Sequence, residues 1–191
     1  MDDMEVNEAS KKYTYEYYLD NDDDVRFELI DGVAYMMASP SPNHQIIAGE
    51  IYRQMWTFLK GKSCRVFMAP CSVFLSYAKG KETVVEPDLF VLCDMSKMND
   101  KGCVGGPDMV LEVLSPSTSK KDRTLKLNKY REAGVREFWI IDPNDKTTSV
   151  HILKDGEYVV TTYSDTETAP VHVLEGCMVN LQEVFAEMVN Y

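Results

Sequence analysis

The stretch "DMVLEVL", residues 108–114, constrains the fold more than any other feature of this chain. Its apolar, β-branched composition predicts a buried strand, yet a carboxylate, Glu112, stands in the middle of it. Burying an ionised carboxylate is expensive unless something pairs with it or binds it. Glu112 must therefore either face solvent on an edge strand or hold a positive partner such as a metal ion.

The length and ends of the chain bound its organisation. A chain of 191 residues suits one domain with a hydrophobic core. We expect a single domain over 1–191, with 1–13 a flexible acidic N-terminus. No run approaches the roughly 18 apolar residues that a membrane span requires, and the start, "MDDMEVNEAS", does not read as a secretory signal. These observations predict a cytoplasmic protein without membrane contact.

The cysteines are odd in number, scattered, and never spaced as C-x-x-C. This pattern predicts reduced, mostly buried thiols, and it argues against a disulfide framework or a zinc site. The cysteines are Cys64, Cys71, Cys93, Cys103 and Cys177.

The formal net charge of −11 argues against general affinity for nucleic acids, because binding to phosphates depends on Lys and Arg. The charge is unevenly distributed, however. Residues 1–24 carry nine acidic and two basic side chains, whereas residues 120–136 carry seven basic and two acidic ones. One basic segment could therefore face an anion although the whole protein repels it.

The alternation of elements predicts a mixed α/β or α+β layer protein, with a curved sheet and helices against it. Asp-Gly pairs at 31–32 and 155–156 favour tight hairpin turns. An amphipathic helix is expected over 43–60, ending at Gly61. The remaining expectations are strands at 65–70, 72–77, 83–94, 108–114, 136–143 and 148–160, a loop at 95–107, and helices at 13–19, 115–134 and 180–189.

Two acids and a lysine lie close together in this arrangement. Asp88 follows a proline at the start of "LFVL", and Glu112 lies in the next strand. Asp122, Lys126 and Tyr130 are spaced four apart, which places them on one face of a helix. Oxygen ligands of this kind select Mg²⁺ or Mn²⁺ over zinc. A divalent cation would explain why Glu112 is tolerated inside the strand.

The chain also resembles a known family. The resemblance is carried by an ordered set of motifs: "FELIDG", "SPSPNHQ", "EPDLFVLCD", "DMVLEVLSPST", "DRTLKLNKY", "AGVREFWIIDP" and "DGEY". Together they resemble the Uma-two-type endonucleases of the PD-(D/E)xK, restriction-endonuclease-like superfamily, over nearly the whole chain. The resemblance implies a restriction-endonuclease-like domain over 14–191: a central mixed sheet flanked by helices, with additional N- and C-terminal hairpins.

The resemblance also implies roles for particular residues. Asp88 matches the Asp of the "PD" element and Glu112 the acid of the (D/E)xK element, while Glu28 looks like an acid that completes the metal shell. The chain departs from the pattern at Leu114, where the motif lysine should stand, and Lys126 looks like its relocated equivalent.

The implied activity is Mg²⁺- or Mn²⁺-dependent hydrolysis of DNA, with a metal-bound water attacking the phosphate. Lys126 would orient that water or stabilise the charge that grows on the phosphate. The flanking phosphates would bind basic residues of the 120–136 segment, namely Lys120, Lys121, Arg123 and Lys129. A homodimer is expected because cutting both strands needs two sites.

Each of these residues also has a structural alternative. Asp88 could be a turn residue, Glu112 an outward-facing acid, and Lys126 the partner of Asp122 in an i,i+4 pair worth only about 0.3–0.5 kcal/mol.

His44, Asp122 and Tyr130 are auxiliary candidates. His44 could instead cap or pack the helix that begins at 43, and Tyr130 could pack under the sheet rather than hydrogen-bond a phosphate or Lys126. For the whole protein, two alternatives stay open: an inactive nucleic-acid-binding or assembly module of the same fold, and a hydrolase of small nucleotides.

Overall fold

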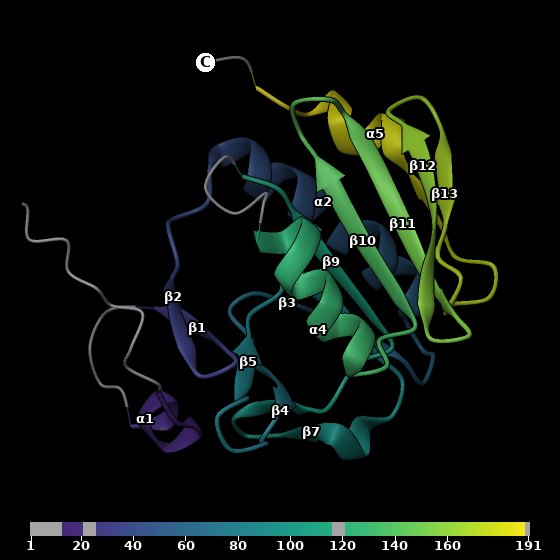
Figure 1. Ribbon diagram of the computed structural model, residues 1–191. Helices are drawn as coiled ribbons and strands as arrows, with labels where there is room; N and C mark the ends of the chain where they lie inside the picture. The colour runs from purple at the N-terminus through teal and green to yellow at the C-terminus, as the bar shows by residue number, and fades with distance from the viewer. Residues whose placement is uncertain (1–12, 21–25, 116–120, 190–191) are drawn as a thin grey trace, which may run out of the picture.

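The computed structural model describes residues 13–20, 26–115 and 121–189, and within them the chain forms layered sheets with flanking helices (Figure 1). The predicted mixed α/β class is confirmed. The strands of the described chain are divided among two six-stranded sheets and one two-stranded sheet. The sequence did not predict this division, because strand patterns do not specify which strands pair.

Sheet A has the strand order β2-β1-β5-β4-β8-β7 and is antiparallel except where β4 and β8 pair in parallel. Its strands are β1 (Phe27–Ile30), β2 (Val33–Met36), β4 (Val73–Ser76), β5 (Thr83–Val85), β7 (Met98–Asn99) and β8 (Gly102–Val104).

Sheet B has the order β12-β11-β10-β9-β6-β3, with β9 and β10 parallel and all other pairs antiparallel. Its strands are β3 (Arg65–Met68), β6 (Leu89–Leu92), β9 (Met109–Val113), β10 (Glu137–Asp142), β11 (Thr147–Lys154) and β12 (Glu157–Ser164). A separate hairpin pairs β13 (Thr168–Pro170) with β14 (Met178–Asn180).

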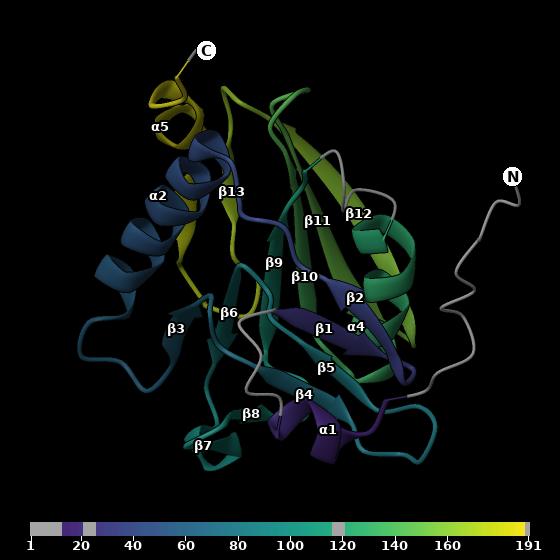
Figure 2. The same cartoon turned by 90° about the vertical axis from the view of Figure 1, so that its left-hand side faces the viewer.

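The helices cover both faces of sheet B. In Figure 2, α2 (Pro42–Leu59) and α5 (Leu181–Ala186) lie on one side of it and α4 (Leu127–Glu132) on the other. A short helix α1 (Tyr15–Leu19) packs its tyrosines on sheet A, where Tyr15 meets Phe74, and Tyr18 meets Phe27, in T-shaped ring contacts.

The two faces of β9 divide the core because side chains alternate along a strand. Met109, Leu111 and Val113 face α2 and α5, together with Trp139 of β10. Val110 and Leu114 face α4. Glu112 shares this second face, so its carboxylate points towards α4 and sheet A.

Sheet A turns one residue of β1 towards the same space. Leu29 lies on the face of sheet A that packs against α1, whereas Ile30 belongs to the apolar cluster beneath α4. Alternation puts Glu28 on the same side as Ile30. The turn that follows has positive φ at Asp31 and Gly32, as the two-residue hairpin prediction requires.

The segment 95–107 was predicted as a loop and instead contains a 3-10 turn η2 (Met95–Lys97) and the hairpin β7–β8. The Asn99 side chain accepts hydrogen bonds from the backbone amides of Lys101 and Gly102 and so closes the hairpin turn. The predicted helix near 115–134 is described from Lys121 onward, and there it runs through a π-helical turn η3 (Asp122–Lys126) into α4.

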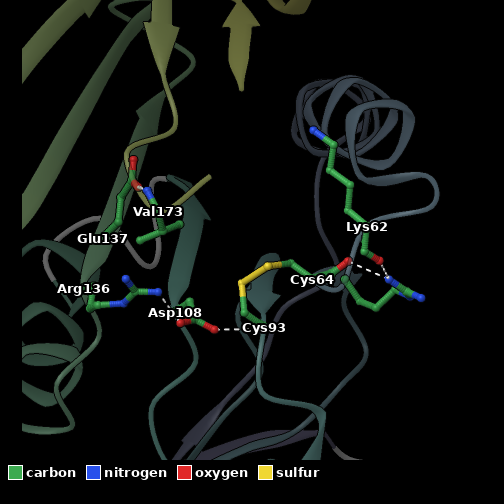
Figure 3. The surroundings of a disulfide bond; sticks show 8 residues. Lys62, Cys64, Cys93, Asp108, Arg136, Glu137 and Val173 are labelled. Atoms are coloured by element: carbon green, nitrogen blue, oxygen red, sulfur yellow. Dashed lines mark hydrogen bonds and ion pairs between the residues drawn. A yellow bond between two sulfur atoms is a disulfide. The ribbon is translucent and has the colours of Figure 1, made fainter. Parts of the chain in front are cut away.

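The prediction that all cysteines are reduced is wrong for two of them. Cys64 and Cys93 form a disulfide, while Cys71, Cys103 and Cys177 remain free (Figure 3). The antiparallel register of β3 and β6 pairs Arg65 with Leu92, so the disulfide joins the next pair of opposed residues. Sequence spacing does not reveal such a pair, because the register decides it.

Candidate active site

A cavity of about 650 Å³ opens where the parallel strands β9 and β10 reach their carboxyl ends. The start of α2, the start of β6 and the η3 turn also contribute to its wall. The titratable side chains of this wall are Arg26, Glu28, His44, Glu86, Asp88, Glu112, Lys121, Asp122 and Lys126.

Asp88 stands just before β6 and closes the ladder between β6 and β9. Its Oδ2 accepts a hydrogen bond of 2.7 Å from the amide of Val113, and His44 Nε2 lies 3.0 Å from the same oxygen. The contacts of the Asp88 carboxylate within the described chain all use Oδ2, which leaves Oδ1 uncommitted towards the cavity. Asp88 therefore has a structural role and a spare ligand oxygen.

His44 reaches Asp88 because Ser41 caps α2 one turn earlier, and the Ser41 hydroxyl accepts a hydrogen bond from the His44 amide. The ring is mostly buried, and Nδ1 has no hydrogen-bond partner among the described residues. Ser41, and not His44, is therefore the N-cap of α2, and the buried His44 side chain contacts Asp88.

Glu112 is only 4% exposed, so it is not an outward-facing acid. Its Oε1 lies 2.5 Å from Lys126 Nζ and accepts a 2.6 Å hydrogen bond from the Tyr130 hydroxyl. No contact with the described chain uses Oε2. The buried carboxylate is tolerated because an ammonium group and a hydroxyl converge on one of its oxygens.

The η3 turn and α4 deliver these partners from one face, as the spacing of four predicted. Asp122, Lys126 and Tyr130 are all buried, and Lys126 Nζ lies 3.8 Å from Asp122 Oδ1. The pairing with Asp122 is thus weaker in geometry than the pairing with Glu112. π-Helical turns are rare and occur mostly at functional sites.

Both oxygens of Glu28 are committed to lysines. Oε1 accepts from Lys126 Nζ at 2.7 Å and Oε2 from Lys121 Nζ at 2.6 Å. The Glu86 amide also donates to Oε1, at 3.2 Å. The side chain that the family resemblance assigns to the metal shell therefore holds two ammonium groups.

Burial and charge set the protonation of this cluster. Burial raises the pKa of Glu112 well above its usual value, and Lys126 offsets this only in part. Burial opposes ionisation of Glu28, but Lys126 and Lys121 outweigh it and hold the pKa of Glu28 below the usual value. Burial likewise disfavours the charged form of Lys126, yet Glu112 and Glu28 raise its pKa well above the usual value. Lys126 is thus an ammonium group, with Glu28 as its ionised partner.

The predicted phosphate-binding residues do not gather at one place. Lys121 lines the cavity, whereas Arg123 pairs with Asp142 at 2.7 Å. Lys129 pairs with Asp31 and Glu132 beside a separate, smaller hollow. Lys120 lies outside the described residues.

The sequence analysis did not predict the polar contacts at the rim of the cavity. Arg26 pairs there with Glu86, which also accepts a hydrogen bond of 3.4 Å from the Tyr18 hydroxyl. Glu86 stands two residues before Asp88 in the "EPD" motif, which was the available signal. On the opposite rim, Asn43 exchanges two hydrogen bonds with the backbone of Val189, and only the tertiary fold brings these residues together.

The donor set fits one hard divalent cation. Asp88 Oδ1 and Glu112 Oε2 are both free of contacts with the described chain and belong to the same cavity wall. Within the described residues, no group of three or more His, Cys, Asp or Glu side chains is placed to hold a metal. Mg²⁺ does not require such a group, since it usually takes one or two carboxylates and keeps several waters.

The fold agrees with comparisons to known proteins. The structure is similar to the crystal structure of a "putative nuclease belonging to DUF820" from Anabaena variabilis, with a TM-score of 0.69 at 20% sequence identity. The match covers 84% of this chain and 89% of that one, and the two proteins share the fold.

A family match is more direct. Residues 12–182 match the Uma2 family, described as "putative restriction endonuclease", and the chain belongs to this family. It is also 26% identical over 143 residues to "Uncharacterized protein slr1290" of Synechocystis sp. (strain ATCC 27184 / PCC 6803 / Kazusa), covering 72% of each chain. In the part of the chain that the structure describes, no helix is long and apolar enough to cross a membrane.

Proposed function

We propose that the protein is a nuclease that hydrolyses phosphodiester bonds of DNA and depends on Mg²⁺ or Mn²⁺. One observation carries the proposal: Asp88 and Glu112 meet at one cavity, each with an uncommitted oxygen, beside a buried ammonium group. Membership of a nuclease-like family supports the reaction class.

The side chains have distinct roles in this proposal. Asp88 and Glu112 would hold the divalent cation, since each keeps one oxygen free of contacts with the described chain. When bound, such a cation polarises a phosphate oxygen and lowers the pKa of a water. His44 and the Val113 amide keep the Asp88 carboxylate oriented through its other oxygen.

Lys126 stabilises negative charge that develops on the phosphate. Its ammonium group is kept charged by Glu112 and Glu28 and is nearly free of competing solvent, at 3% exposure. Fixed charges aimed at developing charge are effective in water-poor sites. Lys121, at the cavity wall, contacts a flanking phosphate.

The test is DNA cleavage by the full chain with Mg²⁺ or Mn²⁺, repeated with EDTA. Asp88→Asn and Glu112→Gln should reduce cleavage to the EDTA level. Glu137→Gln is a matched control, because Glu137 is also a fully buried acid but does not line the cavity. Cleavage that persists in both site variants would reject the proposal.

Two other results would redirect the assignment. Salt-sensitive DNA binding that persists in EDTA without scission would identify a binding module of the same fold. Cleavage of a dinucleotide without duplex binding would identify a small-substrate hydrolase.

A homodimer is part of the proposal, because cutting both strands of a duplex needs two active sites. Light scattering during size-exclusion chromatography measures the mass directly. A monomer at assay concentration that still makes double-strand breaks would contradict the dimer and leave the nuclease assignment standing.

A further inference from the structure

Glu28 differs from Asp88 and Glu112, two other acids of the cavity wall, in how its oxygens are used. Asp88 and Glu112 each keep one oxygen free of contacts with the described chain, whereas both oxygens of Glu28 accept short hydrogen bonds from lysines. Glu28 is also 1% exposed and accepts a further hydrogen bond from the Glu86 amide. A cation could bind Glu28 only by displacing an ammonium group.

Lys126 occupies the space between two acids from different sheets. Its Nζ lies 2.7 Å from Glu28 Oε1 of sheet A and 2.5 Å from Glu112 Oε1 of sheet B. A second metal ion between these carboxylates would coincide with the ammonium group. Like charges at such distances repel strongly inside a protein.

We propose that Glu28 is a positioning residue that anchors Lys126 and Lys121, and that the site takes one divalent cation, held by Asp88 and Glu112 alone. The proposal deepens the nuclease assignment and rests on it. The Lys126 ammonium group occupies the position that a second cation would take, and Glu28 fixes the position of that group.

The anchor also explains how a lysine can act from outside the strand that carries Glu112. Leu114 stands at the strand position where the superfamily motif has lysine, and it is buried in the cluster beneath α4. Lys126 must therefore arrive from the η3 turn, on a different element. Glu28 and Glu112 hold the Lys126 ammonium group from two sides. These two contacts fix its position although the lysine is not on the strand that carries Glu112.

The first experiment titrates the full chain with Mn²⁺ alone, by calorimetry. Wild type should bind one equivalent. Asp88→Asn and Glu112→Gln should weaken binding more than about 100-fold, whereas Glu28→Gln should weaken it by about 10–100-fold at most, since it removes no ligand. Glu137→Gln should bind as wild type does.

The second experiment measures lysine exposure without any activity assay. Reductive methylation followed by peptide mass spectrometry should leave Lys126 unmodified in wild type, because it is 3% exposed. In Glu28→Gln, Lys126 and Lys121 should both become reactive. Lys129 pairs with Asp31 and Glu132, so its labelling should not change and serves as the internal reference.

The outcomes separate this proposal from the nuclease assignment. Two equivalents of Mn²⁺, or a Glu28→Gln loss as large as that of Glu112→Gln, would overturn the anchor role and leave the nuclease intact. Unchanged labelling of Lys126 in Glu28→Gln would also overturn it. Absence of Mn²⁺ binding in wild type would overturn both.

One bound Mn²⁺ without cleavage of any nucleic acid would overturn the nuclease assignment alone. If Glu28→Gln does not fold, Glu28→Asp replaces it: the shorter carboxylate keeps the charge but cannot reach both lysines. Glu28→Asp should therefore retain Mn²⁺ and expose one lysine, and loss of Mn²⁺ there would refute the proposal.

Discussion

Asp88 and Asp108 occupy equivalent positions at opposite ends of the paired strands β6 and β9, and they differ in what their second oxygen meets. Asp88 precedes β6 and accepts from the amide of Val113, whereas Asp108 precedes β9 and accepts from the amide of Cys93. Asp108 Oδ1 then pairs with Arg136, as Figure 3 shows. Asp88 Oδ1 has no such partner within the described chain.

One glutamate at each end of this strand pair, Glu137 and Glu112, differs from the other in the same way. At the end of Asp108, Glu137 accepts from Trp139 Nε1 at 2.7 Å through one oxygen and from the Val173 amide at 2.8 Å through the other. At the end of Asp88, the contacts of Glu112 with the described chain use Oε1 alone. We call these the closed end and the open end.

The comparison separates structural acids from functional ones. Both ends contain buried carboxylates, so burial alone does not distinguish a structural acid from a functional one. A carboxylate whose two oxygens are satisfied by protein donors completes a fold. One that keeps an oxygen free at a cavity wall has capacity left for a ligand, and four predictions test whether this distinction holds.

The largest predicted difference in stability comes from breaking one ion pair at each end. Lys126→Ala should destabilise the protein by about 3–5 kcal/mol, because it leaves buried carboxylates unpaired. Arg136→Ala should cost only about 0–1 kcal/mol, because that pair is exposed to solvent. Urea denaturation measures both, and equal losses would contradict the contrast.

The disulfide should stabilise the closed end without affecting the open one. Cys64 and Cys93 are 29 residues apart, and closing such a loop typically contributes about 2–4 kcal/mol. The double variant Cys64→Ser, Cys93→Ser should lose that amount in urea denaturation and keep wild-type Mn²⁺ affinity. Weakened Mn²⁺ binding would show that the two ends are coupled.

Glu137→Gln should change how stability depends on pH. Burial raises the pKa of Glu137 in the folded protein, so the stabilising protonated form is fully present below the usual carboxyl pKa. That contribution is lost as pH rises through the raised folded pKa. The variant does not titrate there, so its deficit should be largest at low pH, roughly 1–3 kcal/mol for a lost hydrogen bond, and shrink as pH rises.

Urea denaturation between pH 4 and pH 8, a range chosen to span the usual carboxyl pKa of about 4.3, measures this trend. A deficit that grows with pH would mean that Glu137 is stabilised as an anion, which is the opposite of the expected trend.

The smallest effect concerns DNA binding. Lys121 lines the cavity and Lys129 does not. Lys121→Ala should lower the slope of log affinity against log salt by about 1, and Lys129→Ala should leave it unchanged. Fluorescence anisotropy in EDTA measures both without cleavage, and equal slopes in the two variants would remove the special role of Lys121.

Local patterns in the sequence predicted much of this molecule. Periodicity located α2 and β9, and the Asp-Gly pairs located two hairpin turns. The spacing of Asp122, Lys126 and Tyr130 predicted their common face, because helical geometry depends only on nearby residues. The buried acid in β9 pointed to a cation as its partner, and Lys126 is that cation in the structure.

Long-range pairing was beyond such patterns. Nothing near Cys64 reveals that the register of β3 and β6 will oppose it to Cys93. Nothing near Glu28 reveals that both of its oxygens will be taken by lysines almost a hundred residues away.

The sequence by itself determined which groups this protein buries and which residue types are available to meet them, because periodicity and composition act along the chain. Only the tertiary structure decided which oxygens remain free. Asp88, Glu112 and Glu28 are alike as carboxylates. They differ because strand pairing and the η3 turn bring two lysines to one acid, one lysine to another, and a backbone amide with His44 to the third.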